Sequence, residues 1–163
     1  MMPNLRPMNH RDLGRLKCRT FEEQDLVDLM KDIEPGQQER YYLTAARCRA
    51  MGPAVSYLED QEVICSFGVT IIWKGVGEIW LATSPLWIKY ALPAVIWVED
   101  WLDWLQDEND LARLQADVLA ENEMGRRFIE HYGFVAEGVM RSYDEQGRDM
   151  VRYARIREED NGK

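Results

Sequence analysis

The stretch from Arg113 to Phe134 constrains the fold most, because it reads as a strand, a short helix and the start of another strand with little linker between them. Apolar and polar residues alternate in its first part, where Leu114, Ala116 and Val118 lie between Arg113, Gln115 and Asp117. This alternation predicts a strand, Arg113 to Leu119, with one apolar face. Asn122 can cap a helix that starts at Glu123, and Gly133 allows the left-handed turn that ends it. We therefore predict a compact strand–helix–strand unit.

The rest of the chain predicts further helices and strands on both sides of this unit. Helices are expected at Glu22–Ile33, Gln38–Met51 and Leu92–Asp107, and strands at Ala54–Glu59, Val63–Trp73, Glu78–Thr83, Glu137–Tyr143 and Met150–Ile156. Thr20 and Glu23 fit a capping box for the first helix. The strand Val63–Trp73 is apolar on both faces, so it should be central in its sheet. In the helix Leu92–Asp107, Gln106 falls on the polar side.

Composition excludes several classes of protein. A chain of 163 residues can bury a core without disulfides, and its three cysteines are an odd number with no CxxC spacing. With only two histidines, far apart, we predict no metal site and a reduced, cytoplasmic protein. No apolar run reaches the roughly 18 residues of a membrane span. The net charge of −9 argues against a nucleic-acid-binding surface.

The strand, Asn122, the helix, and the aromatic–Gly–Phe sequence ending at Phe134 together resemble the second half of the GNAT acyltransferases. The resemblance reaches from about Val63 to Ile156. It implies the acyl-CoA N-acyltransferase-like fold, of the α/β (α+β) class, with a mixed, mostly antiparallel twisted sheet of six or seven strands flanked by helices. Glu78–Thr83 and Arg113–Leu119 should be adjacent and parallel. We expect a single domain at 16–157, an arm or edge element at 1–15 and a polar tail at 158–163.

The resemblance also implies that the chain uses acetyl-CoA and which residues would hold it. These are the backbone of Leu81, Ala82 and Thr83, the phosphate loop at Lys89, Tyr90 and Ala91, and the side chains of Asn122 and Arg126. The loop departs from the family pattern, because it lacks the leading cation and the glycines. Each assignment has a plainer alternative: an ordinary core strand, a helix cap at Asn122, and surface pairing of Arg126 with Glu130.

Glu78 matches the position of the carboxylate that takes the proton of the amine in some members of the family. Its alternative is an exposed carboxylate at the start of a strand. The tyrosine that commonly protonates the leaving thiolate is replaced by Ile129, which cannot donate a proton. Tyr132 points about 60° away from it around the helix and is predicted to be a core residue.

Two functions remain open from the sequence. The first is an N-acetyltransferase that transfers an acetyl group from acetyl-CoA to the amine of a small molecule or peptide. The second is a catalytically silent binding or structural protein that has kept the fold, similar to small GNAT-like proteins of tailed phages. Glu78 and Asn122 favour the enzyme, whereas Ile129 and the loop without glycine favour the alternative. Exposed tryptophans among the six in the chain would favour a homodimer.

Overall fold

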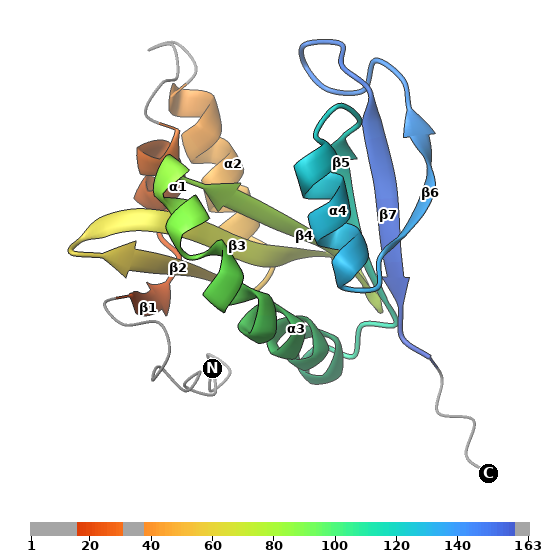
Figure 1. The fold of residues 1–163 in the computed structure, drawn as a ribbon, viewed down its shortest axis with the longest axis horizontal. Helices are drawn as coiled ribbons and strands as arrows, with labels where there is room; N and C mark the ends of the chain where they lie inside the picture. Colours follow the sequence, from red (N-terminus) through yellow and green to blue (C-terminus); the bar gives the residue numbers. More distant parts are fainter. Residues whose placement is uncertain (1–15, 31–37, 159–163) are drawn as a thin grey trace. The chain divides into compact units, whose positions relative to one another are not determined.

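Seven strands form one sheet in the structure. The computed structural model describes residues 16–30 and 38–158. Its elements are β1 (Lys17–Thr20), α1 (Glu23–Leu29), α2 (Gln38–Ala50), β2 (Ala54–Glu59), β3 (Glu62–Trp73), β4 (Val76–Thr83), the 3₁₀ helix η3 (Pro85–Lys89), α3 (Ala91–Glu108), β5 (Arg113–Leu119), α4 (Glu123–His131), β6 (Val135–Met140) and β7 (Met150–Ile156). Figure 1 shows these elements along the chain.

The strand order is β1-β2-β3-β4-β5-β7-β6, so β3 is an interior strand, as its apolar sequence indicates, but β4 and not β3 is the middle strand of the seven. β1 with β2, β2 with β3, β5 with β7, and β6 with β7 are antiparallel, whereas β4 and β5 run parallel. A parallel pair needs a crossover connection, and α3 provides it. The predicted mixed, mostly antiparallel sheet is therefore confirmed, including its one parallel pair.

The chain divides into two compact units. Unit 1 consists of Met1–Gly68 and Leu81–Leu102, and unit 2 of Val69–Trp80 and Asp103–Lys163. The boundary between the units divides β3 and β4. β3 begins in unit 1 and ends in unit 2, whereas β4 begins in unit 2 and ends in unit 1. The predicted arm at 1–15 and nearly all of the predicted tail lie outside the described residues, and the domain boundaries 16–157 stay a prediction.

Unit 1 has an aromatic core on the strands β2 and β3. The rings of Tyr57 and Phe67 are stacked with centroids 5.7 Å apart, and Trp101 of α3 meets Phe67 edge-on at 4.3 Å. Such edge-to-face contacts add to the hydrophobic contribution of the buried rings. Trp101 is thus a core residue. Trp73, by contrast, has 65% of its surface exposed.

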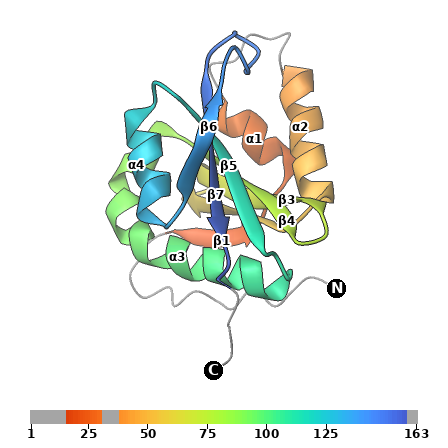
Figure 2. The same cartoon turned by 90° about the vertical axis from the view of Figure 1, so that its right-hand side faces the viewer.

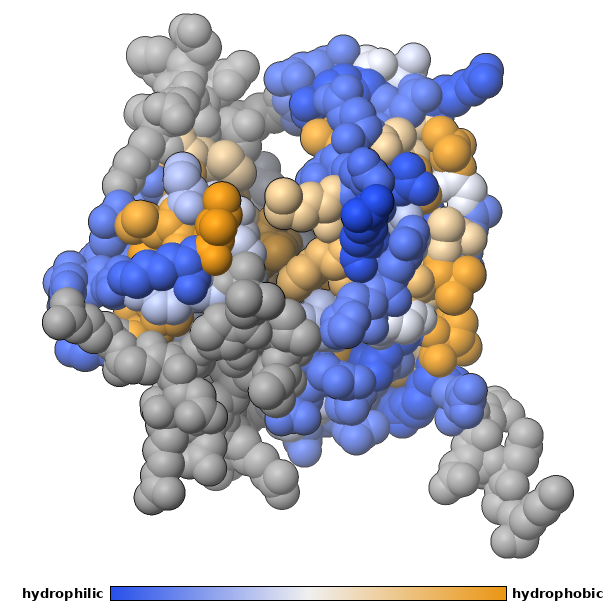
Figure 3. Space-filling model, viewed as in Figure 1, coloured by the Kyte–Doolittle hydropathy of each residue, from blue (hydrophilic) through white to orange (hydrophobic). Residues whose placement is uncertain are grey.

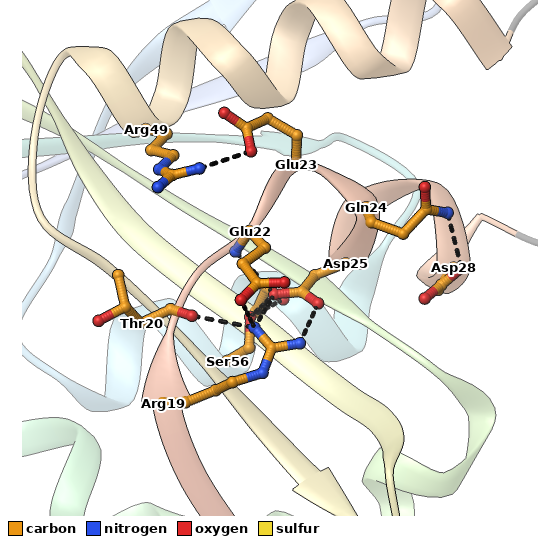
Figure 4. Close-up of polar contacts among 10 residues, drawn as sticks. Arg19, Thr20, Glu22, Glu23, Gln24, Asp25, Asp28, Arg49 and Ser56 are labelled. Carbon is orange, nitrogen blue, oxygen red and sulfur yellow. Dashed lines mark hydrogen bonds and ion pairs between the residues drawn. The ribbon is translucent and has the colours of Figure 1, made fainter.

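A buried polar network centred on Asp25 connects α1 to the strands of unit 1 (Figure 4). Arg19 donates to both carboxylate oxygens of Asp25, at 2.8 and 2.6 Å. The hydroxyl of Ser56 donates to Oδ2 at 2.6 Å and lies 2.8 Å from the hydroxyl of Ser66. Asp25 is only 1% exposed, so its charge is compensated almost entirely by these protein groups.

The start of α1 differs from the predicted capping box. Glu22 is the N-cap residue, and its N–H donates to Oδ2 of Asp25 at 2.8 Å. The predicted box of Thr20 and Glu23 is wrong, because β1 extends through Thr20 and the helix begins only at Glu23. The predicted end of this helix lies outside the described residues.

Unit 2 packs α4 against β5 and β7 (Figure 2). Gly77 of β4 lies in a tight position, because a Cβ atom there would come within 2.6 Å of Val69 Cγ2 and 3.0 Å of Leu111 Cδ1. Gln106 of α3 is buried and donates to the carbonyl oxygen of Leu111 at 3.2 Å. The prediction that Gln106 lies on a solvated side is therefore wrong, because the turn after α3 needs its amide.

Two strands of unit 2 begin earlier than predicted. β4 starts at Val76 rather than Glu78, because the turn at Gly75, with φ of 81°, ends just before it. β6 spans Val135–Met140 rather than Glu137–Tyr143, because the chain enters the strand directly after Phe134. β6 is an edge strand whose Val135 and Val139 are 69% and 60% exposed, and apolar surface is visible along this edge in Figure 3.

Candidate active site

Glu78 occupies the last paired position between the two parallel strands. The register of β4 and β5 comprises Val76 with Arg113, Gly77 with Leu114, and Glu78 with Gln115. β4 nevertheless continues to Thr83 and β5 to Leu119. The pairing of the two strands therefore ends at Glu78, before either strand ends.

The carboxylate of Glu78 is held by the amide of Gln115. Gln115 Nε2 donates to Glu78 Oε2 at 2.9 Å, and Arg113 Nε donates to Gln115 Oε1 at 3.1 Å. Because Arg113 fixes the oxygen end of the amide, its nitrogen end faces Glu78. Gln115 is 7% exposed, whereas the side chain of Glu78 is 40% exposed. Glu78 is therefore oriented by a buried group and open to solvent at the same time.

Two arginine–carboxylate pairs lie beside Glu78. Arg152 donates to Asp117 through Nε at 2.8 Å and Nη2 at 2.7 Å, and Arg113 donates to Glu137 at 2.8 and 2.6 Å. The hydrogen bond to Asp117 raises the pKa of Arg152, and the hydrogen bond from Arg113 lowers the pKa of Glu137. Both guanidinium groups thus have a bidentate partner other than Glu78.

The charges of this group do not cancel. Arg152 Nη2 lies 3.8 Å from Glu78 Oε2, compared with 2.7 Å from Asp117 Oδ2. The three carboxylates of Glu78, Asp117 and Glu137 outnumber the two arginines by one negative charge. Since each arginine is committed to another carboxylate, the excess negative charge belongs to Glu78. Such a carboxylate can accept a proton while the two bidentate pairs of Arg113 and Arg152 stay intact.

Six of the residues implied to hold the cofactor lie in unit 1. Leu81 and Thr83 at the end of β4 are exposed, whereas Ala82 is buried. Tyr90 is also buried, and Ala91 is the first residue of α3. The exposed Leu81 and Thr83 are not the ordinary core residues of the plainer alternative, whereas the buried Ala82 is compatible with a core strand.

Lys89 is the cation of the loop at the end of η3. Its Nζ lies 2.9 Å from Glu59 Oε1 and 5.0 Å from the centroid of the Tyr90 ring. The hydrogen bond to Glu59 raises the pKa of Lys89, so the ammonium group stays charged. An anionic ligand at this end of α3 would compete with Glu59 for the ammonium group.

The other two residues implied for the cofactor, Asn122 and Arg126, lie in unit 2. Asn122 Oδ1 accepts a hydrogen bond from Gly125 N at 2.9 Å, which confirms its prediction as a helix cap. Arg126 donates to Tyr153 Oη at 3.1 Å and to the carbonyl oxygen of Ala120 at 3.3 Å. The hydroxyl group of Tyr153 links Arg126 to Glu130, because it accepts from Arg126 and donates to Glu130 Oε1 at 2.7 Å.

The structure therefore assembles a site around Glu78 that includes residues which the sequence reasoning did not select. Gln115, Asp117 and Arg152 were missed, although the polar residues of β5 alternate as a set on one face. Ile129 and Tyr132 are 7% and 5% exposed, and Tyr132 is a core residue as predicted. Among the described residues, no helix has the length and apolar character needed to cross a membrane.

No family model matches the chain, and no curated protein matches its sequence. Solved structures do match. One is an acetyltransferase of the GNAT family from Streptococcus pneumoniae, at 16% identity and a TM-score of 0.63, with 86% of this chain and 98% of that chain covered.

Two further structures match over similar lengths. The ribosomal-protein-S5-alanine acetyltransferase from Vibrio fischeri has 16% identity and a TM-score of 0.66, with 89% of this chain and 94% of that chain covered. A mutant form of the spermidine/spermine N-acetyltransferase SpeG from Vibrio cholerae has 18% identity and a TM-score of 0.65, with 87% and 94% covered. At these identities the likeness concerns the fold.

Proposed function

We propose that this chain, which has the fold of the GNAT acetyltransferases, is an N-acetyltransferase that moves an acetyl group from acetyl-CoA to an amine. The single observation that carries the proposal is the position of Glu78. Its carboxylate lies where the pairing of β4 and β5 ends, is oriented by Gln115, and carries the excess negative charge of its neighbourhood. A fold alone can host many functions, so the chemistry rests on this site.

Glu78 would act as the general base of the transfer. An alkylammonium group has to lose a proton before its nitrogen can attack a carbonyl carbon, and a carboxylate within hydrogen-bond reach or one water away can take that proton. The nitrogen then forms a bond to the acetyl carbon, while the bond from that carbon to the thioester sulfur breaks. The thiolate leaves and takes a proton from water, because Ile129 has none to give.

Several of the residues present could contact an acetyl-CoA molecule, and one residue, Glu59, opposes its binding. In unit 1, Leu81 and Thr83 are exposed and could meet its pantetheine arm. Lys89 offers a positive charge to its phosphates, and α3 begins at Ala91, so the positive end of the helix dipole lies there. Glu59 opposes this binding by pairing with Lys89. Arg126 is held by Tyr153 and is a weaker candidate for phosphate contact.

The proposal is tested by calorimetric titration of acetyl-CoA into the purified chain, followed by acetylation assays on a panel of amines. Spermidine, spermine and alanine-containing peptides come first, because the names of two similar structures mention spermidine, spermine and alanine, and other peptide N-termini and aminoglycosides come next. Binding of acetyl-CoA together with transfer to at least one acceptor would support the proposal. Folded protein that binds acetyl-CoA but transfers no acetyl group to any amine of the panel would contradict the proposed N-acetyltransferase activity.

A second candidate function is a catalytically silent binding or structural protein. The buried Ile129 at the position of the usual proton donor favours it, as does the engagement of Lys89 by Glu59. This candidate predicts that acetyl-CoA gives no heat of binding above its heat of dilution. The resemblance to phage proteins stays a prediction.

A further inference from the structure

We propose that Asp117 is a positioning residue that keeps Arg152 from closing onto Glu78, so that the carboxylate of Glu78 stays free to take a proton. The inference rests on the proposed function, since it explains how one carboxylate in a group with two arginines remains a base. All the residues concerned lie in unit 2.

The geometry places Arg152 between two carboxylates and commits it to one of them. Asp117 and Arg152 are direct cross-strand partners on β5 and β7, and both of the donors that Arg152 uses point at Asp117. The same Nη2 atom is 3.8 Å from Glu78 Oε2. Glu78 is therefore the second carboxylate within reach of the guanidinium group, at a distance where a small side-chain rotation would create a close ion pair.

Burial makes this arrangement selective. The side chain of Asp117 is 14% exposed and that of Arg152 is 29% exposed, compared with 40% for Glu78. Charges attract each other more strongly where water is partly excluded. The more buried carboxylate, that of Asp117, therefore binds the guanidinium group closely, whereas the more exposed carboxylate of Glu78 stays farther from it.

The remaining charged groups around Glu78 do not replace Asp117 in this role. On β5, Arg113 points to Glu137 of β6 and reaches Glu78 only through the amide of Gln115. Glu137 is in turn occupied by both nitrogens of Arg113. Arg152 is thus the cation whose partner decides how strongly the charge of Glu78 is stabilised.

Two substitutions should act in opposite directions. In Asp117→Asn the guanidinium group loses its anionic partner and turns to Glu78, which stabilises the charged carboxylate and weakens it as a base. We expect turnover to fall roughly three- to tenfold and the acidic limb of the pH–rate profile to move to lower pH. In Arg152→Gln the cation is absent, so the acidic limb should move to higher pH. In the double variant the effect of Asp117→Asn should disappear, because it acts through Arg152.

The experiment measures pH–rate profiles of acetyl transfer for the parent chain, both single variants and the double variant. It also follows the carboxyl carbon resonance of Glu78 by NMR in protein with ¹³C-labelled glutamate, which needs no activity. Asp103→Asn is the matched control, because it removes the carboxylate of another arginine pair in unit 2, that of Arg155. Circular dichroism verifies that each variant is folded.

Opposite shifts in Asp117→Asn and Arg152→Gln, with no shift in Asp103→Asn, would support the inference. It would be overturned if Asp117→Asn folded and left both the profile and the resonance midpoint of Glu78 unchanged. If Asp117→Asn does not fold, the Arg152→Gln variant provides the test. An unchanged midpoint of the Glu78 resonance in Arg152→Gln would also refute the role of Arg152. If the NMR shifts occur and the parent chain transfers nothing, the charge arrangement stands and the proposed function fails.

Discussion

The two units each contain a carboxylate that an arginine and neutral groups surround, but the two carboxylates are in opposite situations. Asp25 of unit 1 is 1% exposed and accepts hydrogen bonds from Arg19, Ser56 and the N–H of Glu22. Glu78 of unit 2 is 40% exposed in its side chain and accepts one hydrogen bond of 2.9 Å, from the neutral amide of Gln115. Both sites look like polar networks, yet only the second has capacity left for a ligand.

This difference separates a structural role from a catalytic one. A buried charge that accepts four hydrogen bonds from protein groups stabilises the fold only as long as these partners are present. A carboxylate that is oriented by one buried amide and otherwise open can exchange protons without disturbing the fold. Substitutions in unit 1 should therefore change the free energy of unfolding, and substitutions at Glu78 should change turnover.

Replacing Asp25 should have the largest effect on stability. Asp25→Ala leaves the guanidinium group of Arg19, whose side chain is 36% exposed, and the buried hydroxyl of Ser56 without their anionic partner. A hydrogen bond to a charged group contributes roughly 1.5–3 kcal/mol, so we expect a loss of about 3 kcal/mol or more. Urea denaturation followed by circular dichroism measures this loss. Asp28→Ala is the control on the same helix, because Asp28 is exposed and should change stability by less than about 0.5 kcal/mol. Equal losses in the two variants would show that the buried network does not stabilise unit 1.

Ser56→Ala should have the next largest effect, about 2 kcal/mol, since the hydroxyl of Ser56 makes a hydrogen bond of 2.6 Å to a charged group. Ser66→Ala is its matched control, because the hydroxyl of Ser66 meets only the neutral hydroxyl of Ser56 in this network. We expect the loss in Ser66→Ala to be about half as large. A larger loss in Ser66→Ala than in Ser56→Ala would mean that the charge of Asp25 contributes little.

Acid should weaken the network of unit 1 in a predictable direction. Burial raises the pKa of Asp25, but hydrogen bonds from Arg19, Ser56 and the N–H of Glu22 outweigh it and hold this pKa below its ordinary value. The stabilisation is present above the pKa of an unfolded aspartate, about 3.9, and is lost as the pH falls through the lower folded-state pKa.

The free energy of unfolding of the parent chain and of Asp25→Asn, measured by urea denaturation between pH 7 and pH 2.5, tests this dependence. The parent chain should be more stable than Asp25→Asn at pH 7. The difference between their free energies of unfolding should decrease below about pH 3.9. A difference that stays constant over this range would contradict a charged, hydrogen-bonded Asp25.

The sequence predicts the elements of this fold better than the networks that connect them. The alternation in β5, the cap at Asn122 and the turn at Gly133, with φ of 81°, are local signals, because each depends on residues within a few positions. Glu78 is selected through the family resemblance, which places a carboxylate at the start of the predicted strand Glu78–Thr83. The network of Asp25 could not be found from the sequence, since Ser56 is 31 positions away and their contact depends on how β2 lies beside α1.

The missed residues around Glu78 show the same limit. Asp117 and Arg152 are 35 positions apart, and Gln115 and Glu78 are 37 apart. The alternation in β5 predicts only that one face is apolar, and it does not show that Gln115 on the other face is buried among charged partners. Opposite charges on strands that are predicted to pair would have been a usable signal, but the register that brings Asp117 to Arg152 is set by packing over the whole sheet.

The smallest effect on stability is expected at Glu78 itself. Gln keeps the shape of the side chain and can still accept a hydrogen bond from Gln115, so Glu78→Gln should change the free energy of unfolding by less than about 0.5 kcal/mol. Urea denaturation measures this. A loss of several kcal/mol, comparable with that of Asp25→Ala, would show that Glu78 is as structural as Asp25.

The most direct test of the catalytic assignment is the turnover of Glu78→Gln with saturating acetyl-CoA and the best acceptor from the amine panel, compared with the parent chain and with Glu108→Gln. Glu108 is an exposed carboxylate at the end of α3 and serves as the control. We predict that Glu78→Gln lowers turnover by about 10²-fold with nearly unchanged affinity for acetyl-CoA, and that Glu108→Gln runs at the parent rate. A Glu78→Gln variant that runs at the parent rate from pH 6 to pH 9 would contradict the assignment of Glu78 as the base.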